Sequence, residues 1–510
     1  MYFMRVTQRS MYGQMLTNMN KSLSDLMNSN IQAASEKRIN RPSDDPSGMA
    51  RVLNYRASLD NIAQYQANVS TATGWLKTAD SVLSTQVTTV LTRFSELCEQ
   101  GANGTMTADN REEISYEMRQ LFKQIVQYAN QTYEGHHIFA GHKTAGTAFE
   151  EALNVTCNDK TFATADVDFS VEGAAEKTVV VQFRDSGPLT TGMAVQYSED
   201  SGKTWKDGAV TVDGSGEFTT IALGGQNIIV HHPNGTPPTA TAVDPTNLNE
   251  TDNGTWLYVR PTAVYKGDDN DSIEVAKYGS GLATGVAQGY FPADVNVRLD
   301  TAGPPYTYSY SVDGGSTWVT GNQAAGDRLL VPGGFLDLDT SGGAAAAGDQ
   351  FVIHPRRADI SLEINSGEYI KINNIGKDVF GGIYKSPGDD WAKTVYGNDD
   401  ARNLFEVLGR AVAYAETNSQ DGCQRALEEI NTARSVILTF AASVGGRENR
   451  LEAATDMLDN MELTETQTLS NVEDVDFSKL MTQLAQQQLA YQSVLKSSSM
   501  IMQMSLLNYI

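Results

Sequence analysis

The stretch "INRPSDDPSG", from Ile39 to Gly48, separates two runs of sequence that both have helical periodicity. Asp45 is a favourable N-cap, and Pro46 then falls at the first helical position, where its missing N–H costs nothing. Pro42 is expected to end the incoming helix, because the residue before a proline is biased away from helical geometry. The sequence therefore predicts a joint between a short helix and a long one, formed by Arg41, Pro42, Asp44, Asp45 and Pro46.

The first part of the chain, residues 1–145, is predicted to be helical. Apolar residues recur at spacings of three and four in a terminal helix at about 5–40, a long helix at about 47–99 and a third helix at about 108–134. The long run holds no proline, and its one glycine after Gly48 is Gly74. The terminal helix carries an apolar seam that consists of Leu16, Met19, Leu23 and Leu26.

The last part of the chain, residues 399–510, returns to the same helical pattern. The seam of its final helix consists of Leu480, Leu484, Tyr491, Leu495 and Met502. A helix with one apolar stripe needs a neighbour to bury it. We therefore expect residues 399–510 to pack on 1–145, so that both chain ends form one elongated coiled-coil helical rod.

The middle of the chain has a different composition, rich in Gly, Thr, Asp and Val, with short alternating runs typical of strands. Two stretches within it resemble each other, "VQYSEDSGKTW" (Val195–Trp205) and "YSYSVDGGSTW" (Tyr308–Trp318). This repeat predicts two related β modules, at 150–285 and 286–385. The expected fold class is therefore α+β and multidomain, with a β-rich insert between the helical ends.

Both repeats contain the Ser-x-Asp-x-Gly-x-Thr-Trp pattern of the Asp box, a hairpin turn that occurs in sialidases and other β-rich proteins. In such a turn the Asp accepts hydrogen bonds from the backbone, the Gly takes a strained φ, and the Trp packs underneath. We expect a structural role for both turns, whose key residues are Ser198, Asp200, Gly202 and Trp205 in the first and Ser311, Asp313, Gly315 and Trp318 in the second.

The charge excludes several partners. The chain of 510 residues has 38 basic and 62 acidic side chains, a net charge of −24. Such a balance disfavours nucleic acid, whose phosphates need Lys and Arg, and anionic membrane surfaces. No long apolar run predicts membrane insertion, and the first residues lack the apolar core of a signal peptide, so secretion by another route is expected if the protein leaves the cell.

No catalytic, cofactor or metal site is predicted, so the chain is not expected to be an enzyme. The three cysteines, Cys98, Cys157 and Cys423, form no CxxC pair. The histidines in "EGHHIFAGHK" include His136 and His137, which would point in different directions and are not expected to share a metal. Capping explains the aspartates of the joint better than a calcium loop does.

Four stretches resemble the flagellin superfamily, and most closely its hook-associated protein 3 family. They are "INRPSDDPSGMARVLNYRASLDNIAQYQANV", "NREEISYEMRQLFKQIVQYANQTYEGHHIFAGHKT", "EINTARSVILTFAASVGGRENRLE" and the terminal "NVEDVDFSKLMTQLAQQQLAYQSVLKSSSMIMQMSLLNYI". The resemblance covers residues 4 to about 145 and 400 to 510, about half of the chain. The β-rich insert is larger than in many members of the family, so its role is not implied.

The resemblance implies a structural adaptor at the hook–filament junction of the bacterial flagellum. In that family the terminal helices pair into an inner coiled coil, and the protein is exported unfolded by the flagellar type III apparatus to an extracellular position. The implied partners are the first hook-associated junction protein, flagellin, copies of the chain itself in a ring, and an export chaperone. The terminal seams are then expected to fold only during assembly, because a narrow seam alone does not offset chain entropy.

Two alternatives remain open on the sequence. The chain could be a flagellin-type filament subunit, which has the same helical ends. It could instead be a glycan-binding or adhesive surface protein in which the β insert acts and the helices anchor it.

Overall fold

The computed structural model describes residues 8–164, 167–232, 235–244, 253–268, 273–289, 291, 294–355, 358–386, 391–397 and 400–507. The chain divides into two compact units. The first unit consists of Met1–Thr71, Glu363–Tyr369 and Arg450–Ile510, and the second of Ala72–Leu362 and Ile370–Asn449. Among the helices of the described residues, none has the length and apolar character that crossing a membrane requires.

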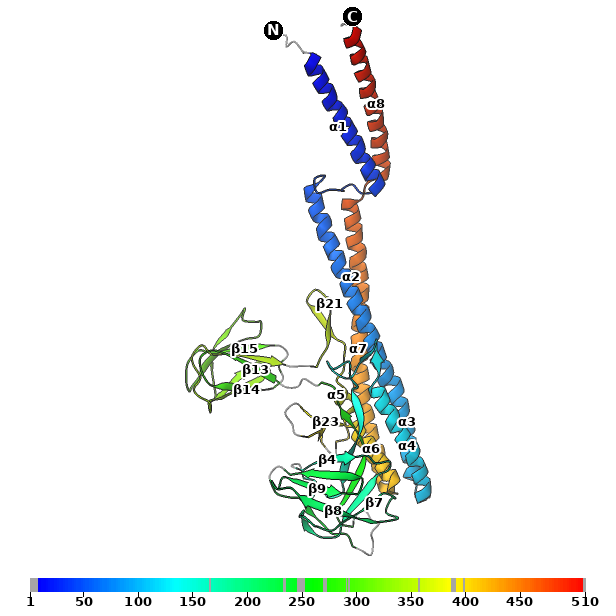
Figure 1. Ribbon diagram of the computed structural model, residues 1–510, viewed down its shortest axis with the longest axis vertical. Helices are drawn as coiled ribbons and strands as arrows, with labels where there is room; N and C mark the ends of the chain where they lie inside the picture. The colour runs from blue at the N-terminus through cyan, green and yellow to red at the C-terminus, as the bar shows by residue number, and fades with distance from the viewer. Residues whose placement is uncertain are drawn as a thin grey trace. The chain divides into compact units, whose positions relative to one another are not determined.

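The helices occupy both ends of the chain, as Figure 1 shows by colour. Their bounds are α1 Gln8–Ser35, α2 Pro46–Asp80, α3 Thr88–Gly101, α4 Ala108–Ala129, α5 Gly376–Phe380, α6 Leu404–Glu416, α7 Gln420–Glu473 and α8 Phe477–Leu507. A π-helical segment, η1 Ser81–Val87, joins α2 to α3, so the helix that starts at Pro46 runs on to Gly101.

Two helix ends differ from the sequence-based expectation. The terminal helix α1 ends at Ser35 and not near residue 40, because Glu36 has a φ of 57°, in the left-handed region that ends a helix. The prediction that Pro42 ends this helix is therefore wrong. The third helix α4 ends at Ala129 and not at 134, because Thr132–Tyr133 (β1) pairs with His136–His137 (β2).

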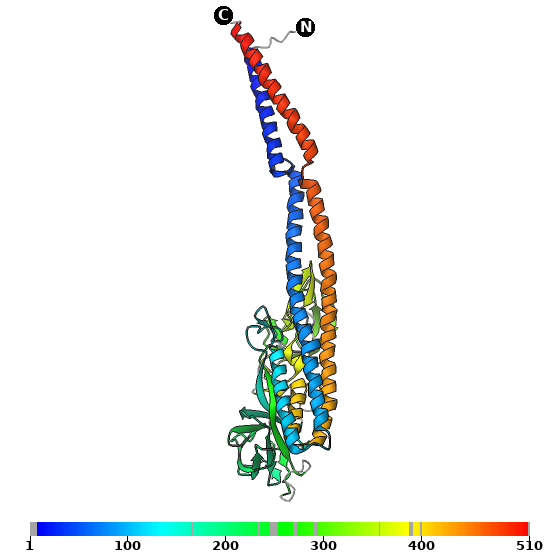
Figure 2. The same ribbon diagram turned by 90° about the vertical axis from the view of Figure 1, so that its right-hand side faces the viewer.

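In the first unit, α1 and α8 pack side by side and run in opposite directions, as Figures 1 and 2 show. Less exposed positions recur along α1 in steps of three and four, at Tyr12, Met15, Met19, Ser22, Leu26, Ser29 and Ala33, with Gln32 and Ser35 also partly covered near its end. This is the spacing by which helices pack along a seam. Farther along the helices from the joint, α2 meets α7, where the Gln66 amide donates to Glu462 over 2.8 Å.

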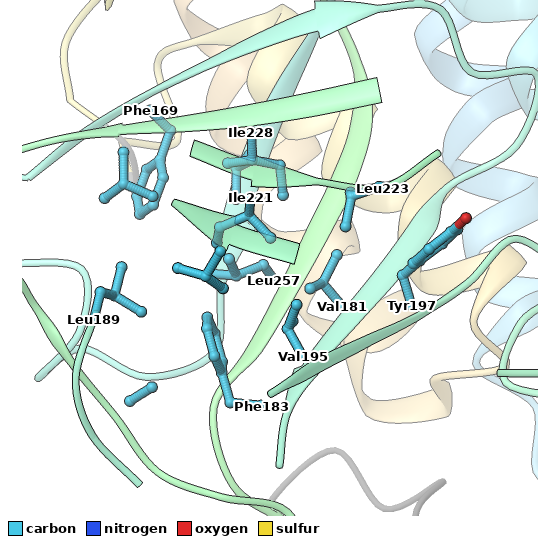
Figure 3. Close-up of a cluster of buried hydrophobic side chains, with 14 of the residues drawn as sticks. Phe169, Val181, Phe183, Leu189, Val195, Tyr197, Ile221, Leu223, Ile228 and Leu257 are labelled. Atoms are coloured by element: carbon cyan, nitrogen blue, oxygen red, sulfur yellow. The ribbon is translucent and has the colours of Figure 1, made fainter. Parts of the chain in front are cut away.

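The second unit contains a first β module, whose strands are β3 Phe149–Cys157, β4 Asp168–Gly173, β5 Val179–Phe183, β7 Val195–Ser198, β8 Lys206–Val212, β9 Phe218–Ala222, β10 Gln226–His231 and β12 Trp256–Tyr265. They form one sheet in the order β12-β5-β7-β8-β9-β10-β4, and β3 pairs with β12. Figure 3 shows the core of this module, in which Phe183, Ile221 and Leu257 are fully buried.

The second β module repeats these pairings. Its strands are β13 Ile273–Tyr278, β14 Thr284–Gly289, β15 Val295–Leu299, β16 Thr307–Ser311, β17 Val319–Gln323, β18 Arg328–Val331, β19 Gly334–Asp339 and β20 Gln350–Pro355. The order β20-β15-β16-β17 matches β12-β5-β7-β8, and β14-β19-β18 matches β4-β10-β9. Likewise β13 pairs with β20 as β3 pairs with β12. The α+β class with two related modules is confirmed.

The expected boundaries of the modules are wrong. The division at 285/286 cuts through β14, and β13 and β14 both belong to the second module because they pair with β20 and β19. That module ends with β20 at Pro355 and not at 385. The sequence signal was the Asp-box hairpin, which lies in the middle of each module and does not mark its ends.

After the second module, the chain returns to the first module and to the helices. A hairpin follows, formed by β21 Ser361–Asn365 and β22 Glu368–Lys371. Its tip, Glu363–Tyr369, belongs to the first unit, within which Arg450 pairs with Glu368 at 2.7 Å. The short strand β23 Ile383–Tyr384 then pairs in parallel with β12, and β24 Lys393–Thr394 pairs with β23. A two-residue pair, β6 Gly187–Pro188 with β11 Thr239–Ala240, completes the strands.

Candidate assembly surface and helix joint

The joint begins α2 with a side-chain cap. One carboxylate oxygen of Asp45 accepts from the backbone N–H of Gly48 at 2.9 Å and from the Ser47 hydroxyl at 3.0 Å. These hydrogen bonds, first that of Gly48 and then that of Ser47, lower the pKa of Asp45. Gly48 fits tightly here, because a Cβ would lie 2.4 Å from an Asp45 oxygen and 2.6 Å from Ile39. The joint thus fixes the start of α2.

The turn before the cap is held by the other aspartate. The Asp44 carboxylate accepts from the backbone N–H groups of Arg41 at 2.9 Å and Asn40 at 3.2 Å. The side chains of Arg41 and Pro42 are exposed. Of the predicted joint residues, Asp44 and Asp45 therefore shape the backbone, and Pro46 is the first residue of α2.

A second break in the helices meets this joint. It lies between Glu473, the last residue of α7, and Phe477, the first of α8. Asp476 caps α8 by accepting from the backbone N–H groups of Ser478 and Lys479 at 3.0 and 3.1 Å. The backbone N–H of Arg38 donates to the carbonyl of Glu473 over 2.7 Å. The two breaks therefore form one joint, which the sequence did not predict.

The predicted seam divides between two faces. On α8, Leu480 is 1% exposed, and Leu484 and Tyr491 are half-buried on the face that α1 covers. On α1, Met19 and Leu26 are half-buried in the same contact. Leu16, Leu23 and Leu495 instead lie on exposed faces, and Met502 lies in α8 with a side chain outside the described part. Pairing of the two ends therefore covers only part of the seam.

The uncovered apolar residues form a second face on each terminal helix. The exposed large apolar side chains are Leu16, Leu23, Met27 and Ile31 on α1, and Phe477, Met481, Leu489, Leu495 and Met500 on α8. A large exposed apolar surface usually marks an interaction site. A helical wheel of α1 could have indicated this second face, because Leu16, Leu23 and Met27 lie beside the stripe that contains Met19 and Leu26 and not within it. We call these nine residues the assembly face.

The two Asp-box turns have matching hydrogen bonds. In the first, the Ser198 hydroxyl donates to Asp200 at 2.7 Å and accepts from the Gly202 N–H at 2.8 Å. In the second, Ser311 donates to Asp313 at 2.7 Å and accepts from the Gly315 N–H at 2.9 Å.

The Asp-box carboxylates serve the turns themselves. Hydrogen bonds from Thr317 lower the pKa of Asp313 to about 2. The Trp205 ring packs edge-on against Trp256 at 6.3 Å, whereas Trp318 donates to the carbonyl of Gly315 at 3.0 Å. These contacts stabilise the turns and leave neither carboxylate poised for acid–base chemistry.

The first turn also contacts helices of its own unit. The Ser201 hydroxyl donates to the backbone carbonyl of Glu416 at the end of α6. Lys203 lies 3.2 Å and Lys177 lies 2.6 Å from the carboxylate of Glu112 on α4. These ion pairs lower the pKa of Glu112 to about 2, with the hydrogen bond from Lys177 as the largest cause. The first module is thus docked on α4 and α6.

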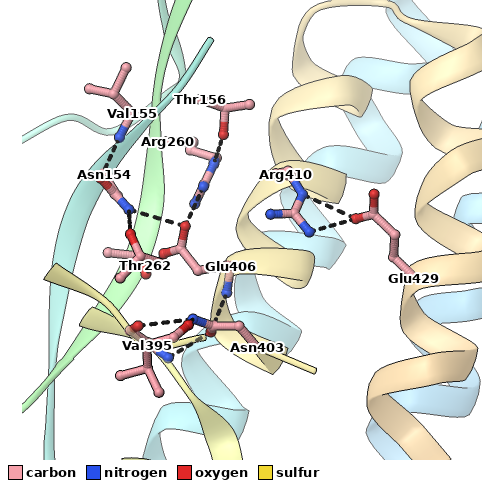
Figure 4. A network of polar contacts seen from close by, with 12 residues as sticks. Asn154, Val155, Thr156, Arg260, Thr262, Val395, Asn403, Glu406, Arg410 and Glu429 are labelled. Atoms are coloured by element: carbon pink, nitrogen blue, oxygen red, sulfur yellow. Dashed lines mark hydrogen bonds and ion pairs between the residues drawn. The ribbon is translucent and has the colours of Figure 1, made fainter. Parts of the chain in front are cut away.

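A buried polar network completes this docking, as Figure 4 shows. Arg260 of β12 and Glu406 of α6 form an ion pair of 2.5 Å, with side chains 1% and 0% exposed. Thr262 also donates to Glu406, at 2.5 Å. Burial alone would raise the pKa of Glu406, but Arg260, the hydrogen bond from Thr262 and the charge of Arg410 together outweigh burial, so the pKa is lowered. A Cβ on Gly409 would lie 2.0 Å from the Pro261 carbonyl, so only glycine permits this approach of α6 to β12.

The histidines and cysteines have structural surroundings. His137 bonds the carbonyl of Asn130 at 2.8 Å, and His136 bonds the Thr144 hydroxyl at 3.1 Å. Cys98 and Cys423 are buried, and burial raises the pKa of Cys423 to about 11. Within the described ranges, no three His, Cys, Asp or Glu side chains are placed to hold a metal ion.

Comparison with known proteins identifies both helical ends. The N-terminal helical region of bacterial flagellin matches residues 6–144, and the C-terminal helical region of bacterial flagellin matches residues 427–510. These matches contain the joint and both halves of the assembly face.

Individual relatives match to different extents. The chain is 30% identical over 166 residues to flagellar hook-associated protein 3 of Salmonella typhimurium, covering 32% of this chain and 52% of that protein. The chain therefore spans about half the length of that relative. It is 23% identical over 494 residues to a flagellin of Salmonella rubislaw, covering 93% of each. The crystal structure of FlgL from Xanthomonas campestris aligns at 15% identity over 82% of this chain and 99% of that chain, with a TM-score of 0.30. Both helical ends of the chain therefore match the helical regions of bacterial flagellin, and flagellar hook-associated protein 3 is among the proteins that the chain is similar to.

Proposed function

We propose that this chain is a non-enzymatic adaptor at the junction between the hook and the filament of a bacterial flagellum. The observation that carries the proposal is the assembly face, which α1 and α8 leave uncovered when they pair with each other. A subunit that must contact neighbours on several sides needs apolar surface beyond its own intramolecular seam. Similarity to flagellar hook-associated protein 3 supports this location.

The mechanism proposed is assembly coupled to folding of the terminal helices. The covered stripe of α1 contains small polar residues, including Ser22 and Ser29, so pairing with α8 alone buries little apolar area. Burial of about 25 cal/mol per Å² of apolar surface must offset the loss of chain entropy. Contacts of Leu16, Leu23 and Leu495 with neighbouring subunits would supply the missing burial.

The proposed partners follow from this position. They are the first hook-associated junction protein on one side, flagellin on the other, and copies of the chain itself in a ring. Export by the flagellar type III apparatus with a chaperone, and an extracellular final position, form part of the same proposal. The acidic balance of the chain, a net charge of −24, suits an exported subunit that must not associate too early.

A filament subunit is the second candidate, because the alignment with flagellin covers 93% of this chain. Deletion of the gene separates the two candidates. A junction adaptor predicts hooks without filaments and flagellin monomers shed into the medium, seen by electron microscopy and immunoblotting. Cells that keep normal filaments would contradict the junction role, and purified chain that polymerises alone into long filaments would favour the filament subunit.

A further inference from the structure

The last residue of α7, Glu473, is a buried carboxylate at the joint of the first unit. Its side chain is 4% exposed. Lys37, which follows α1, places its ammonium group 2.5 Å from one carboxylate oxygen, and Arg56 of α2 donates to the same oxygen. One carboxylate therefore joins a segment after α1, a helix after the joint and the end of α7.

Backbone hydrogen bonds surround this ion-pair cluster. The N–H of Arg38 donates to the Glu473 carbonyl at 2.7 Å, and the N–H of Val475 donates to the Glu36 carbonyl at 3.1 Å. The Arg38 guanidinium also donates to the carbonyl of Val472 at 2.8 Å, across 434 residues of sequence. The two helix breaks thus pair like a very short piece of antiparallel sheet.

We propose that Glu473 is a positioning residue that clasps the two breaks together and so sets the register in which α1 meets α8. The clasp lies where α1 has just ended and α8 is about to begin. Bringing together two segments that are so far apart in sequence costs chain entropy. The contacts of Glu473 at the two breaks can offset this cost before α1 and α8 pack on each other. The heptad faces of α1 and α8 then meet in one register and not in another shifted by a turn.

Charge is the reason for assigning this role to Glu473 and not to its neighbours. A buried carboxylate is costly unless it is paired, and here two cations from different segments reach it. Burial raises the pKa of Glu473, but the hydrogen bonds from Lys37 and Arg56 outweigh burial, so the pKa is lowered and the group is charged at neutral pH. Both cations are about two-fifths exposed, so they can return to water if the carboxylate is neutralised.

The test compares Glu473→Gln with Glu452→Gln in the purified full chain. Glu452 is an exposed carboxylate on the same helix and serves as the control. Hydrogen exchange is measured on peptides that contain the amides of Arg38 and Val475. We expect these amides to exchange about tenfold faster or more in Glu473→Gln, the change that loss of one charge-assisted hydrogen bond makes in a local equilibrium. The control and the β modules should exchange as in the parent chain.

Two results would overturn the clasp. One is equal protection of both amides in all three proteins, and the other is no protection in the parent chain, which would mean that no clasp exists before assembly. If Glu473→Gln fails to fold, as judged by its circular dichroism, Lys37→Met tests the same cluster with the carboxylate retained and should also speed exchange at the two amides.

The inference deepens the proposed function, because a set register matters when α1 and α8 pair during assembly. The experiments nevertheless distinguish a failure of this inference from a failure of the proposed function. Unchanged exchange in Glu473→Gln would remove the clasp and leave the junction role intact. Normal filaments after gene deletion would remove the junction role while the exchange result still stood.

Discussion

The buried pair between Arg260 and Glu406 gives the sharpest test of how the first β module is held on the helices. Replacing Arg260 with Met keeps most of the side-chain volume but leaves a carboxylate that is 0% exposed without its cation. Breaking a buried pair in this way costs about 3–5 kcal/mol. Hydrogen bonds from Thr262 and, at 3.1 Å, from Asn154 remain on Glu406, so we expect the lower end of that range, about 3 kcal/mol.

Urea unfolding followed by tryptophan fluorescence measures this loss, since Trp205 and Trp256 lie in the first module. With a slope of about 1–3 kcal/mol per molar urea, the midpoint should fall by roughly 1–3 M. The matched control is Arg298→Met in the second module, where the arginine is 39% exposed and 3.6 Å from Asp300. An exposed pair of this kind contributes about 0–1 kcal/mol, so the control should change little.

The double variant Arg260→Met with Glu406→Leu should regain most of the stability, because replacing both members of a buried pair by apolar groups is often neutral. Without Arg260, burial is opposed only by groups such as Thr262, which donates a hydrogen bond, and Arg410, which supplies charge, so we expect the pKa of Glu406 to rise from its lowered value. The folded state then favours the protonated form, so the penalty of Arg260→Met should shrink as the pH falls toward 4.5. A loss below about 1 kcal/mol at neutral pH, or a loss that does not shrink in acid, would refute the argument.

Three further predictions concern the joint, the seam and the first β module. Asp45→Ala should cost about 1 kcal/mol by removing the cap of α2, measured by denaturation, and a change near zero would show that the cap is dispensable. Leu484→Asp should block incorporation into flagella in cells without unfolding the β modules, and normal incorporation would contradict the proposed seam. His231 and His232 are buried, which lowers the pKa of each below 6.5. The stability that their neutral forms provide is complete above pH 6.5 and should fall as the pH drops below that value, whereas a flat profile between pH 7.5 and 5.5 would oppose this assignment.

The parts of the structure that the sequence predicted depend on neighbours along the chain. The cap of α2 needs only Asp45 and the next three residues, and each Asp-box turn needs a stretch of eight. Helical periodicity likewise repeats every three or four residues, so both helical ends were visible. The presence of two related β modules could be predicted because their Asp-box hairpins are similar in sequence.

The parts that the sequence did not predict depend on distant partners. Glu406 and Arg260 are 146 residues apart, and nothing near either residue indicates the other. The same is true of Glu473 and Arg56, separated by 417 residues. The predicted end of α1 is wrong for a different reason. Glu36, which precedes Pro42, has a left-handed backbone and its carbonyl accepts from the N–H of Val475, so the helix ends before it reaches the proline. Periodicity alone also could not show which seam residues α8 covers.

The duplicated modules show how small differences decide which copy contacts the helices. Ser201 and Lys203 of the first turn reach the carbonyl of Glu416 and the carboxylate of Glu112. The matching positions of the second turn are Gly314, which has no side chain, and Ser316, whose hydroxyl donates at 3.0 Å to the Asp313 carbonyl of its own turn. Since both turns have the same internal hydrogen bonds, the turn itself cannot be what docks. The contacts of the first turn with α4 and α6 therefore come from the residues between the shared positions of the pattern, and the second turn has other residues at these positions.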